Sequence, residues 1–380
     1  MTLLIAADLA SIALVTCLML ALPVLARPTM PFGVRVTTDR AGDPAVVAQR
    51  RVFARLTVMM AAVAATLSVP VLLAAGHPAV IGTAVTALAA ADLLLYHRAH
   101  RKVRAAKDVG GWTAERRQGV TVDTTFRTDP IRVPWAWSLA ALAVPLVTAG
   151  IGWSRYGELP ATLPLFLGYG IAPAQREPAT LFNAFEPVVY QTAITLLVLA
   201  LVVILLRARP DLDAARPKGS ARRYRVYLRG IAALSLLSAA CLNLGLLVSA
   251  LQLWAIITPT SLWQAAAYLP LAVLLGAWLV WEAKVGAAGH RLPALPGEEK
   301  EDSGLAQRDD DRHWFLAGTV YVNRRDPALL LHARIGSSWT LNLGHPIAWL
   351  LIAVLVVALA SLGLSALFGV IDLPQKQSLF

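Results

Sequence analysis

Eight runs of predominantly apolar residues divide this chain of 380 residues. A hydrocarbon core about 30 Å thick needs roughly 20 apolar residues to be crossed by an α-helix. Each run meets that length, so the pattern predicts an all-α membrane fold, an eight-helix transmembrane bundle. The predicted helices are 3–26, 56–75, 79–97, 134–153, 188–206, 231–254, 263–282 and 347–371.

Basic residues lie in alternate loops between these runs. Thirty-one of the thirty-four Lys and Arg residues fall in four blocks, at 27–55, 98–132, 207–229 and 284–334. Cytoplasmic loops of membrane proteins are enriched in Lys and Arg, so the alternation predicts a multi-pass protein of the bacterial inner or plasma membrane. Both termini are then extracytoplasmic. Because basic residues follow the first run and none precedes it, we expect an uncleaved first helix.

The composition supports this class of protein and narrows its partners. Apolar residues make up 57% of the chain and charged residues 15%, whereas soluble domains have about 25% charged residues. The formal charge of +11 is divided among loops that flank the membrane. Anionic lipids at the cytoplasmic face are therefore the expected counter-ions. Direct nucleic-acid binding is not expected, because no motif for it is present.

Two loops are long enough to carry a function, and they divide the chain into predicted parts. The first is an external loop within a seven-helix membrane domain. The second is cytoplasmic and begins as an acidic linker that looks disordered. It continues as a small β-hairpin-type module before the last helix, with strands at 313–322 and 328–335, a turn at 323–327 and a candidate third strand at 339–342. The predicted parts are the membrane domain 1–282 with loop 154–187, the linker 283–308, the module 309–346 and the last helix 347–371.

Polar residues of the external loop have two interpretations. They can contact an extracellular peptide, particularly a cationic one. Alternatively, Glu177, Asn183 and Glu186 can cap the following helix, since an acid near a helix N-terminus complements the macrodipole. The external candidates are Pro160, Pro164, Gly168, Asn183 and Glu186.

Two polar residues inside apolar runs are further candidates. Ionisable groups within a bilayer are costly, so Asp92 is either an interfacial residue that pairs with Arg98 or Arg101, or a buried relay or substrate site. Asn243 is more typical of hydrogen bonding between helices. Transport of a small molecule or peptide is the function that these two residues would favour.

The module resembles a small bacterial domain of unknown function, family 5808. The match covers about forty residues and rests on several fixed spacings. The residues that carry it are Trp314, Gly318, Tyr321, Val322, Asn323, Asp326, Pro327, Gly336, Trp339, Thr340, Leu341 and Asn342. In one interpretation these residues have a structural role: the tryptophans form a small core and Asn323 makes a turn. The alternative is a surface for a ligand or partner.

The membrane part resembles a companion family, number 1648. Its first helix is followed by a segment like Phe32-Gly33-Val34-Arg35-Val36, and its external loop contains a pattern like Leu159-Pro160 with Pro164 and a nearby Gly168. Leu165 and Phe166 stand where that pattern has a histidine, so a contact made by that histidine is not expected here.

These families are similar to the membrane immunity and sensing protein of the sporulation-delay toxin system. In that system a polytopic protein protects its producer from an extracellular peptide toxin and holds a repressor at the membrane. The resemblance implies immunity or sensing, with an extracellular peptide and a cytoplasmic regulator as partners.

Sequence motifs for catalysis are missing from the chain. It has no nucleophile elbow, HExxH, Walker motif or dinucleotide fingerprint. His290, His313, His332 and His345 fit no recognised metal-ligand spacing. We therefore assign no catalytic residue, cofactor or metal. A non-enzymatic immunity or sensing protein is the leading hypothesis, with a transporter and then an intramembrane enzyme as alternatives.

Overall fold

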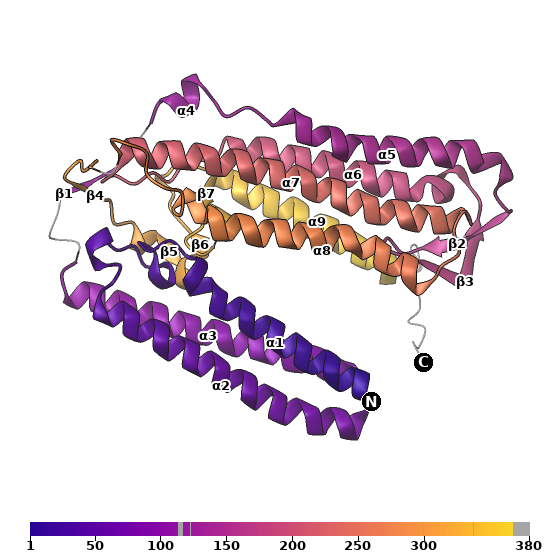
Figure 1. Cartoon of the computed structure of the whole chain (residues 1–380), viewed down its shortest axis with the longest axis horizontal. Coiled ribbons are helices and arrows are strands. Elements are labelled where there is room, and N and C mark those ends of the chain that lie inside the picture. The colour runs from indigo at the N-terminus through magenta and orange to yellow at the C-terminus, as the bar shows by residue number, and fades with distance from the viewer. Residues whose placement is uncertain (113–116, 122, 299, 337, 368–380) are drawn as a thin grey trace. The chain divides into compact units, whose positions relative to one another are not determined.

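The computed structural model describes residues 1–112, 117–121, 123–298, 300–336 and 338–367 (Figure 1). The chain forms two compact units. Unit 1 comprises Met1–Glu115 together with Asp309–Phe380, and unit 2 comprises Arg116–Arg308. The helices of the predicted membrane domain 1–282 are thus shared between the two units. The predicted module belongs to the same unit as the first three helices.

Unit 1 contains a bundle of three helices, α1 (Thr2–Leu25), α2 (Pro44–Ala75) and α3 (Ala79–Val109), which pack against one another (Figure 1). Helix α2 begins after Asp43, whose carboxylate accepts a hydrogen bond from the Ala45 amide at 2.9 Å. This cap satisfies one of the amides that a helix start leaves without a partner. Helices α2 and α3 extend about three turns beyond the predicted segments 56–75 and 79–97, through residues rich in Arg and Lys, which are good helix formers.

Unit 2 contains four long helices, α5 (Trp135–Arg155), α6 (Leu181–Leu206), α7 (Pro217–Leu253) and α8 (Ser261–Lys284). Helix α7 packs against each of the other three and buries a face rich in small residues, including Ala239 and Ala240. Small side chains let helix backbones approach closely, which is the usual packing solution within a bilayer.

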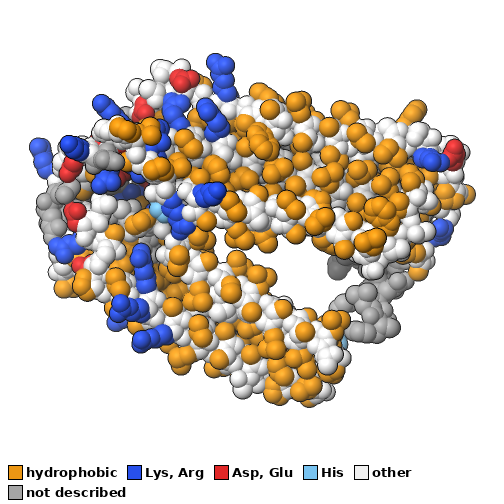
Figure 2. Space-filling view, viewed as in Figure 1, with side chains coloured by type: hydrophobic (Ala, Val, Ile, Leu, Met, Phe, Trp, Pro, Cys, Tyr) orange, Lys and Arg blue, Asp and Glu red, His pale blue; other side chains and the backbone are white. Residues whose placement is uncertain are grey.

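Seven helices of the described residues are long and apolar enough to cross a membrane: α1, α2, α3, α5, α6, α7 and α8. On the face shown in Figure 2, hydrophobic side chains are spread along the α1–α3 bundle, and Lys and Arg side chains lie near one end. The prediction of a helical multi-pass membrane protein is therefore confirmed. The eighth predicted segment coincides with α9 (Pro346–Leu367). Its described side chains provide a shorter apolar stretch, Pro346–Val357, and the predicted residues 368–371 lie outside the described chain.

The predicted external loop 154–187 contains a β-hairpin that the sequence pattern did not predict. Strands β2 (Thr162–Phe166) and β3 (Ile171–Pro178) pair antiparallel, with an irregularity between Pro164 and Leu165. Leu163 and Phe166 are buried in a cluster with Leu246 and Trp254. Proline lacks a ladder donor and argues against a strand, and this explains the missed prediction.

Short elements complete unit 2. Strand β1 (Arg117–Gly119) pairs in parallel with β4 (Leu305–Gln307), and α4 (Thr125–Thr128) is a single turn. The predicted linker 283–308 thus contains a strand. Its acidic residues Glu298 and Glu301 also bind the first turns of α7.

The C-terminal module (residues 309–345) consists of two local hairpins. Strands β5 (Trp314–Phe315) and β6 (Val320–Tyr321) form the first, and β7 (Leu330–His332) and β8 (Trp339–Leu341) form the second. The predicted single strand 313–322 is wrong, because Leu316–Gly318 interrupts it with a tight turn at positive φ. The candidate third strand, 339–342, is present as β8.

Asn342 joins the two hairpins of the module. Its side-chain oxygen accepts from the amides of Asn323 and Gly344, both at 3.0 Å. Its amide nitrogen donates to the carbonyls of Asn323, Asp326 and Ala328 at 2.9, 3.0 and 3.2 Å. One fully buried side chain therefore satisfies backbone groups of the turn at 323–328 and of Gly344.

Asn342→Ala is expected to destabilise the module by about 2–4 kcal/mol, because it leaves buried amides and carbonyls without partners. Asn342→Asp is the matched control for shape, and we expect it to destabilise the module at least as much. Its second oxygen would face three carbonyls where the wild-type nitrogen donates. Amide hydrogen exchange of residues 320–345 in the detergent-solubilised protein measures both effects. Wild-type protection in the Asp variant would contradict the role given to Asn342.

Candidate functional site at the junction of the α1–α3 bundle and the C-terminal module

The most densely connected polar site of unit 1 lies where the module meets the α1–α3 bundle. Three segments form it: the turn after α1, the C-terminal half of α3, and the module. We call this site the junction. Its residues are Phe32, Gly33, Arg35, His100, Lys107, Asp309, Asp310, Asp311, Ala317, Gly318 and Arg334.

Two glycine turns meet at the junction, backbone against backbone. Gly33 has φ +76° and Gly318 has φ +91°. A Cβ atom on Gly33 would lie 2.1 Å from the carbonyl oxygen of Ala317. Only glycine permits both this conformation and this approach. These two turns, which we call the steric key, therefore fix the position of the module on the bundle.

Three cations and three carboxylates surround the glycine contact. Lys107 Nζ donates to Asp311 Oδ2 at 2.6 Å and lies 2.8 Å from Asp309. Arg334 donates to both Asp310 and Asp311. Arg35 donates through Nε to Asp310 at 3.1 Å and through its backbone amide to Asp311 at 3.2 Å. We call these six residues the ion cluster, namely Arg35, Lys107, Asp309, Asp310, Asp311 and Arg334.

The ion cluster is balanced in charge and largely buried. Lys107 is 3% exposed and Arg334 is 2% exposed. Burial alone would raise the pKa of Asp311, but the charges of Arg334 and Lys107 and their hydrogen bonds outweigh it and hold that pKa below its ordinary range. Asp311 is thus ionised at neutral pH. Buried charges of this kind are stable only when each keeps its partner.

The turn after α1 is also held from the side of α3. His100 Nδ1 donates to the carbonyl oxygen of Phe32 at 2.8 Å, and Arg334 donates to the carbonyl oxygen of Gly33 at 2.8 Å. The Phe32 ring packs edge-on against Phe53 and Tyr96, at centroid distances of 5.5 and 5.2 Å. These contacts hold Phe32 at φ +49°, a conformation that a non-glycine residue adopts only under such constraint.

Most of the module residues singled out by the resemblance contact one another. The Trp314 indole donates to Asp310 at 3.0 Å and packs against Tyr321. The Tyr321 hydroxyl donates to Asp326 at 2.9 Å and accepts from the Asn323 side chain at 3.1 Å. These residues form the core and turn of the module, and Asn342 completes the set. Trp314 also connects this core to the ion cluster.

Three module candidates lie outside that network. Pro327 is exposed after Asp326, and Trp339 packs on His332 with ring centroids 5.1 Å apart. Gly336 has φ +60°, and a Cβ atom there would meet open space. Gly318, in contrast, belongs to the steric key.

The external candidates lie in or beside the β2–β3 hairpin. Pro164 pairs with Arg176 in the ladder, Gly168 is in the turn at φ +77°, and Pro160 is exposed before β2. The hairpin thus brings these three residues of the resemblance into one local structure.

The capping interpretation of this loop needs correction. The cap of α6 is Thr180, whose hydroxyl accepts from the Asn183 amide at 3.2 Å. Asn183 and Glu186 lie inside the helix, which begins at Leu181 and not at 188. Asn183 instead donates its side-chain amide to the Pro178 carbonyl at 3.0 Å.

The two intramembrane candidates lie in different units and differ in their partners. In unit 2, the Asn243 amide donates to the Ala141 carbonyl at 3.0 Å and to the Thr195 hydroxyl at 2.8 Å. In unit 1, Asp92 is fully buried and makes no hydrogen bond within the described residues. The ion pair expected with Arg98 or Arg101 is not formed among the described residues.

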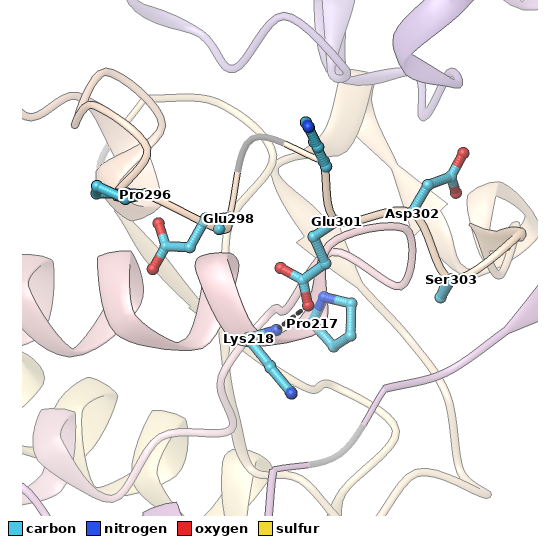
Figure 3. A pocket seen from close by; sticks show the side chains of 9 residues that line it. Pro217, Lys218, Pro296, Glu298, Glu301, Asp302 and Ser303 are labelled. Carbon is cyan, nitrogen blue, oxygen red and sulfur yellow. Dashed lines mark hydrogen bonds between the residues drawn. The ribbon is translucent and has the colours of Figure 1, made fainter.

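A cavity of about 650 Å³ lies at the start of α7, beneath the predicted linker (Figure 3). The Glu301 carboxylate accepts from the backbone amides of Lys218 and Gly219 at 2.8 and 2.9 Å. Glu298 pairs with Arg222 at 2.7 Å, and this hydrogen bond, with one from the Leu295 amide, lowers the pKa of Glu298 to about 2. The chain's own carboxylates therefore occupy the positions that an anionic ligand would take.

The polar groups of the junction hold the module and the bundle together. All of its carboxylates face cations, and among the described residues no group of three His, Cys, Asp or Glu side chains could hold a metal ion. Lys107 and Arg334 were not singled out from the sequence. The one available signal was three consecutive aspartates, Asp309–Asp311, in a chain of net charge +11. The Phe32–Val36 segment was noted through a resemblance, without its partner.

Comparisons with known proteins identified no relative. No family model, curated protein or solved structure matches the chain. The resemblances seen in the sequence stay predictions, and a proposal about function rests on the geometry of the two units.

Gly33→Ala should destabilise unit 1 by about 2–4 kcal/mol, because the added methyl group clashes with the Ala317 backbone and the residue needs positive φ. Gly336→Ala is the control in the same unit. It also needs positive φ but meets open space, so its cost should be about 1 kcal/mol. Thermal unfolding in detergent compares the two. Equal losses would show that the turn contact adds nothing beyond backbone strain.

Asp311→Asn should cost about 3–5 kcal/mol, since it leaves Lys107 and Arg334 buried without a full counter-charge. Asp309→Asn, at a more exposed position, should cost about 1 kcal/mol or less. The Asp311 pKa is lower in the folded than in the unfolded protein, so its stabilisation is complete above about pH 4 and declines as the pH falls further. Melting temperatures measured from neutral to acidic pH should fall more steeply in the wild type than in Asp311→Asn, which lacks the contribution of Asp311.

Proposed function

We propose that this chain is a non-enzymatic bacterial inner-membrane protein of the immunity or sensing type. In this proposal eight helices cross the membrane, α9 being the eighth, and both termini are extracytoplasmic. The β2–β3 hairpin meets an extracellular peptide, and the C-terminal module meets a cytoplasmic regulator. Anionic lipids neutralise the basic loops at the cytoplasmic face.

One observation supports this proposal most directly. The module is fixed to the bundle by the junction, yet it presents two adjacent apolar side chains to the surroundings. Phe315 is 51% exposed and Leu316 is 67% exposed. Leu316 also has φ +46°, a costly conformation that persists only where the surrounding structure fixes it. Exposed apolar side chains on a rigid support are typical of a protein-binding surface.

The hairpin offers chemistry suited to a cationic peptide. Glu177 on β3 and Glu186 on α6 are close enough to interact electrostatically. Two carboxylates in one place attract a basic ligand and are relieved of their repulsion when it binds. We rank sensing above transport because the Asn243 amide is engaged in packing α5, α6 and α7 together.

The test is a quantitative capture of partners from membranes in mild detergent. The double variant Phe315→Ser/Leu316→Ser should recover at least about tenfold less regulator than the wild type, the loss expected for binding residues of this kind. Val109→Ser is the matched control, because Val109 is apolar, in the same unit and 91% exposed. It should recover the regulator as the wild type does.

Unchanged elution of both variants in size-exclusion chromatography shows that folding is preserved. The proposal fails if the double variant and the wild type recover the same proteins in the same amounts. It also fails if Val109→Ser loses the regulator to the same extent, since the effect would then not belong to the tip.

A further inference from the structure

Asp92 is an isolated carboxyl group inside the α1–α3 bundle. It is fully buried on α3, and the Thr57 side chain of α2 lies beside it and is also fully buried. Neither carboxyl oxygen of Asp92 has a hydrogen-bond partner among the described residues, and the Thr57 hydroxyl has none either. The bundle therefore encloses an acid and a hydroxyl that face each other without a formed bond.

Three other sets of buried polar groups have partners, and this distinguishes Asp92 from them. Asp8 on α1 accepts a hydrogen bond from the Ser68 hydroxyl of α2 at 2.5 Å. Asn243 uses both amide hydrogens. The carboxylates of the ion cluster each face a cation. Asp92 alone among these groups has neither a donor nor a counter-charge in the described part of the chain.

Ionisable groups on the elements packed around Asp92 do not supply that counter-charge. On α1 and α2 they are Asp8, Cys17, Arg50, Arg51 and Arg55. On α3 they are Tyr96, His97, Arg98, His100, Arg101, Lys102, Arg104, Lys107 and Asp108. Arg51, Arg55 and His97 are exposed. None of these groups forms an ion pair or hydrogen bond with Asp92.

We infer that Asp92 is a proton-binding site, in which a neutral carboxylic acid offers its O–H to the Thr57 hydroxyl. An ionised carboxylate buried in a bilayer without a cation is strongly disfavoured. Protonation removes the charge, and a neutral carboxylic acid can still donate one hydrogen bond to the Thr57 hydroxyl.

The position of Asp92 gives the proton a structural consequence. Asp92, Tyr96 and His100 are spaced four residues apart, so they follow one face of α3. Tyr96 packs against the Phe32 ring, and His100 holds the Phe32 carbonyl at the junction. Loss of the proton would place a charge between α2 and α3 on the same helix face that supports the junction. This inference holds whether or not the module binds a regulator.

A hydrophobic carbodiimide tests the inference on the full-length protein in lipid nanodiscs. The acid gives its proton to a carbodiimide nitrogen while its oxygen bonds to the central carbon. Migration of the acyl group to nitrogen then leaves a stable N-acylurea, detected by peptide mass spectrometry. Protonated carboxyls in apolar surroundings react, whereas ionised, exposed ones do not. Glu158, whose side chain is 69% exposed and paired with Arg155, is the internal reference.

At neutral pH we expect Asp92 to be modified at least about tenfold more than Glu158, as one unit of difference in proton affinity would produce. Asp92→Asn should remove the adduct from that peptide and leave the rest of the map unchanged. If this variant fails to insert, fragmentation of the wild-type peptide still assigns the modified residue. An unmodified Asp92, or equal modification of Asp92 and Glu158, would overturn the inference.

Discussion

The pairing of Lys107 and Arg334 with Asp311 is the constraint on which unit 1 depends. These side chains are almost wholly buried, and a buried charge tolerates only a geometry that keeps its partner. Lys107 belongs to α3 and Arg334 to the module, so one carboxylate connects two parts of the chain that lie more than two hundred positions apart. The module is consequently an integral part of the α1–α3 bundle, with one defined way to sit on it.

Shape complements charge at the same place. The ion cluster alone would tolerate small shifts, since long side chains can follow their partners. The contact between Gly33 and Ala317 does not tolerate such shifts, because two backbone segments meet there and neither can move aside. His100 and the Phe32 ring hold the first of the two turns from α3 and α2. Electrostatic attraction and steric fit therefore specify the same arrangement, and each reduces the number of alternatives left to the other.

The sequence predicted what depends on neighbours along the chain. Seven helices followed from the length of apolar runs, because a bilayer imposes that length on every span. The module was predicted as β structure, but the turn at Leu316–Gly318 was missed. The backbone of this turn, which has positive φ, packs against Gly33, a residue far away in the sequence. The same limit applies to the site. Asp311 is 276 positions from Arg35, and the residues that surround either one in the sequence do not indicate such a distant partner. Leu163 and Phe166 similarly acquire their role as strand residues from helices α6 and α7.

Asn243 and Asp92 show two different outcomes for a polar group among apolar helices. Asn243 meets a carbonyl of α5 and a hydroxyl of α6, so its amide adds specificity to packing and has no donor left over for a ligand. Asp92 meets a single hydroxyl that cannot neutralise a charge, so its stable form inside the bundle is the one that carries a proton. The sequence treats the two residues alike, as polar positions in apolar runs. What separates them is charge: the Asn243 amide is neutral and needs no counter-ion, whereas Asp92 would need a cation that the described part of the neighbouring helices does not pair with it.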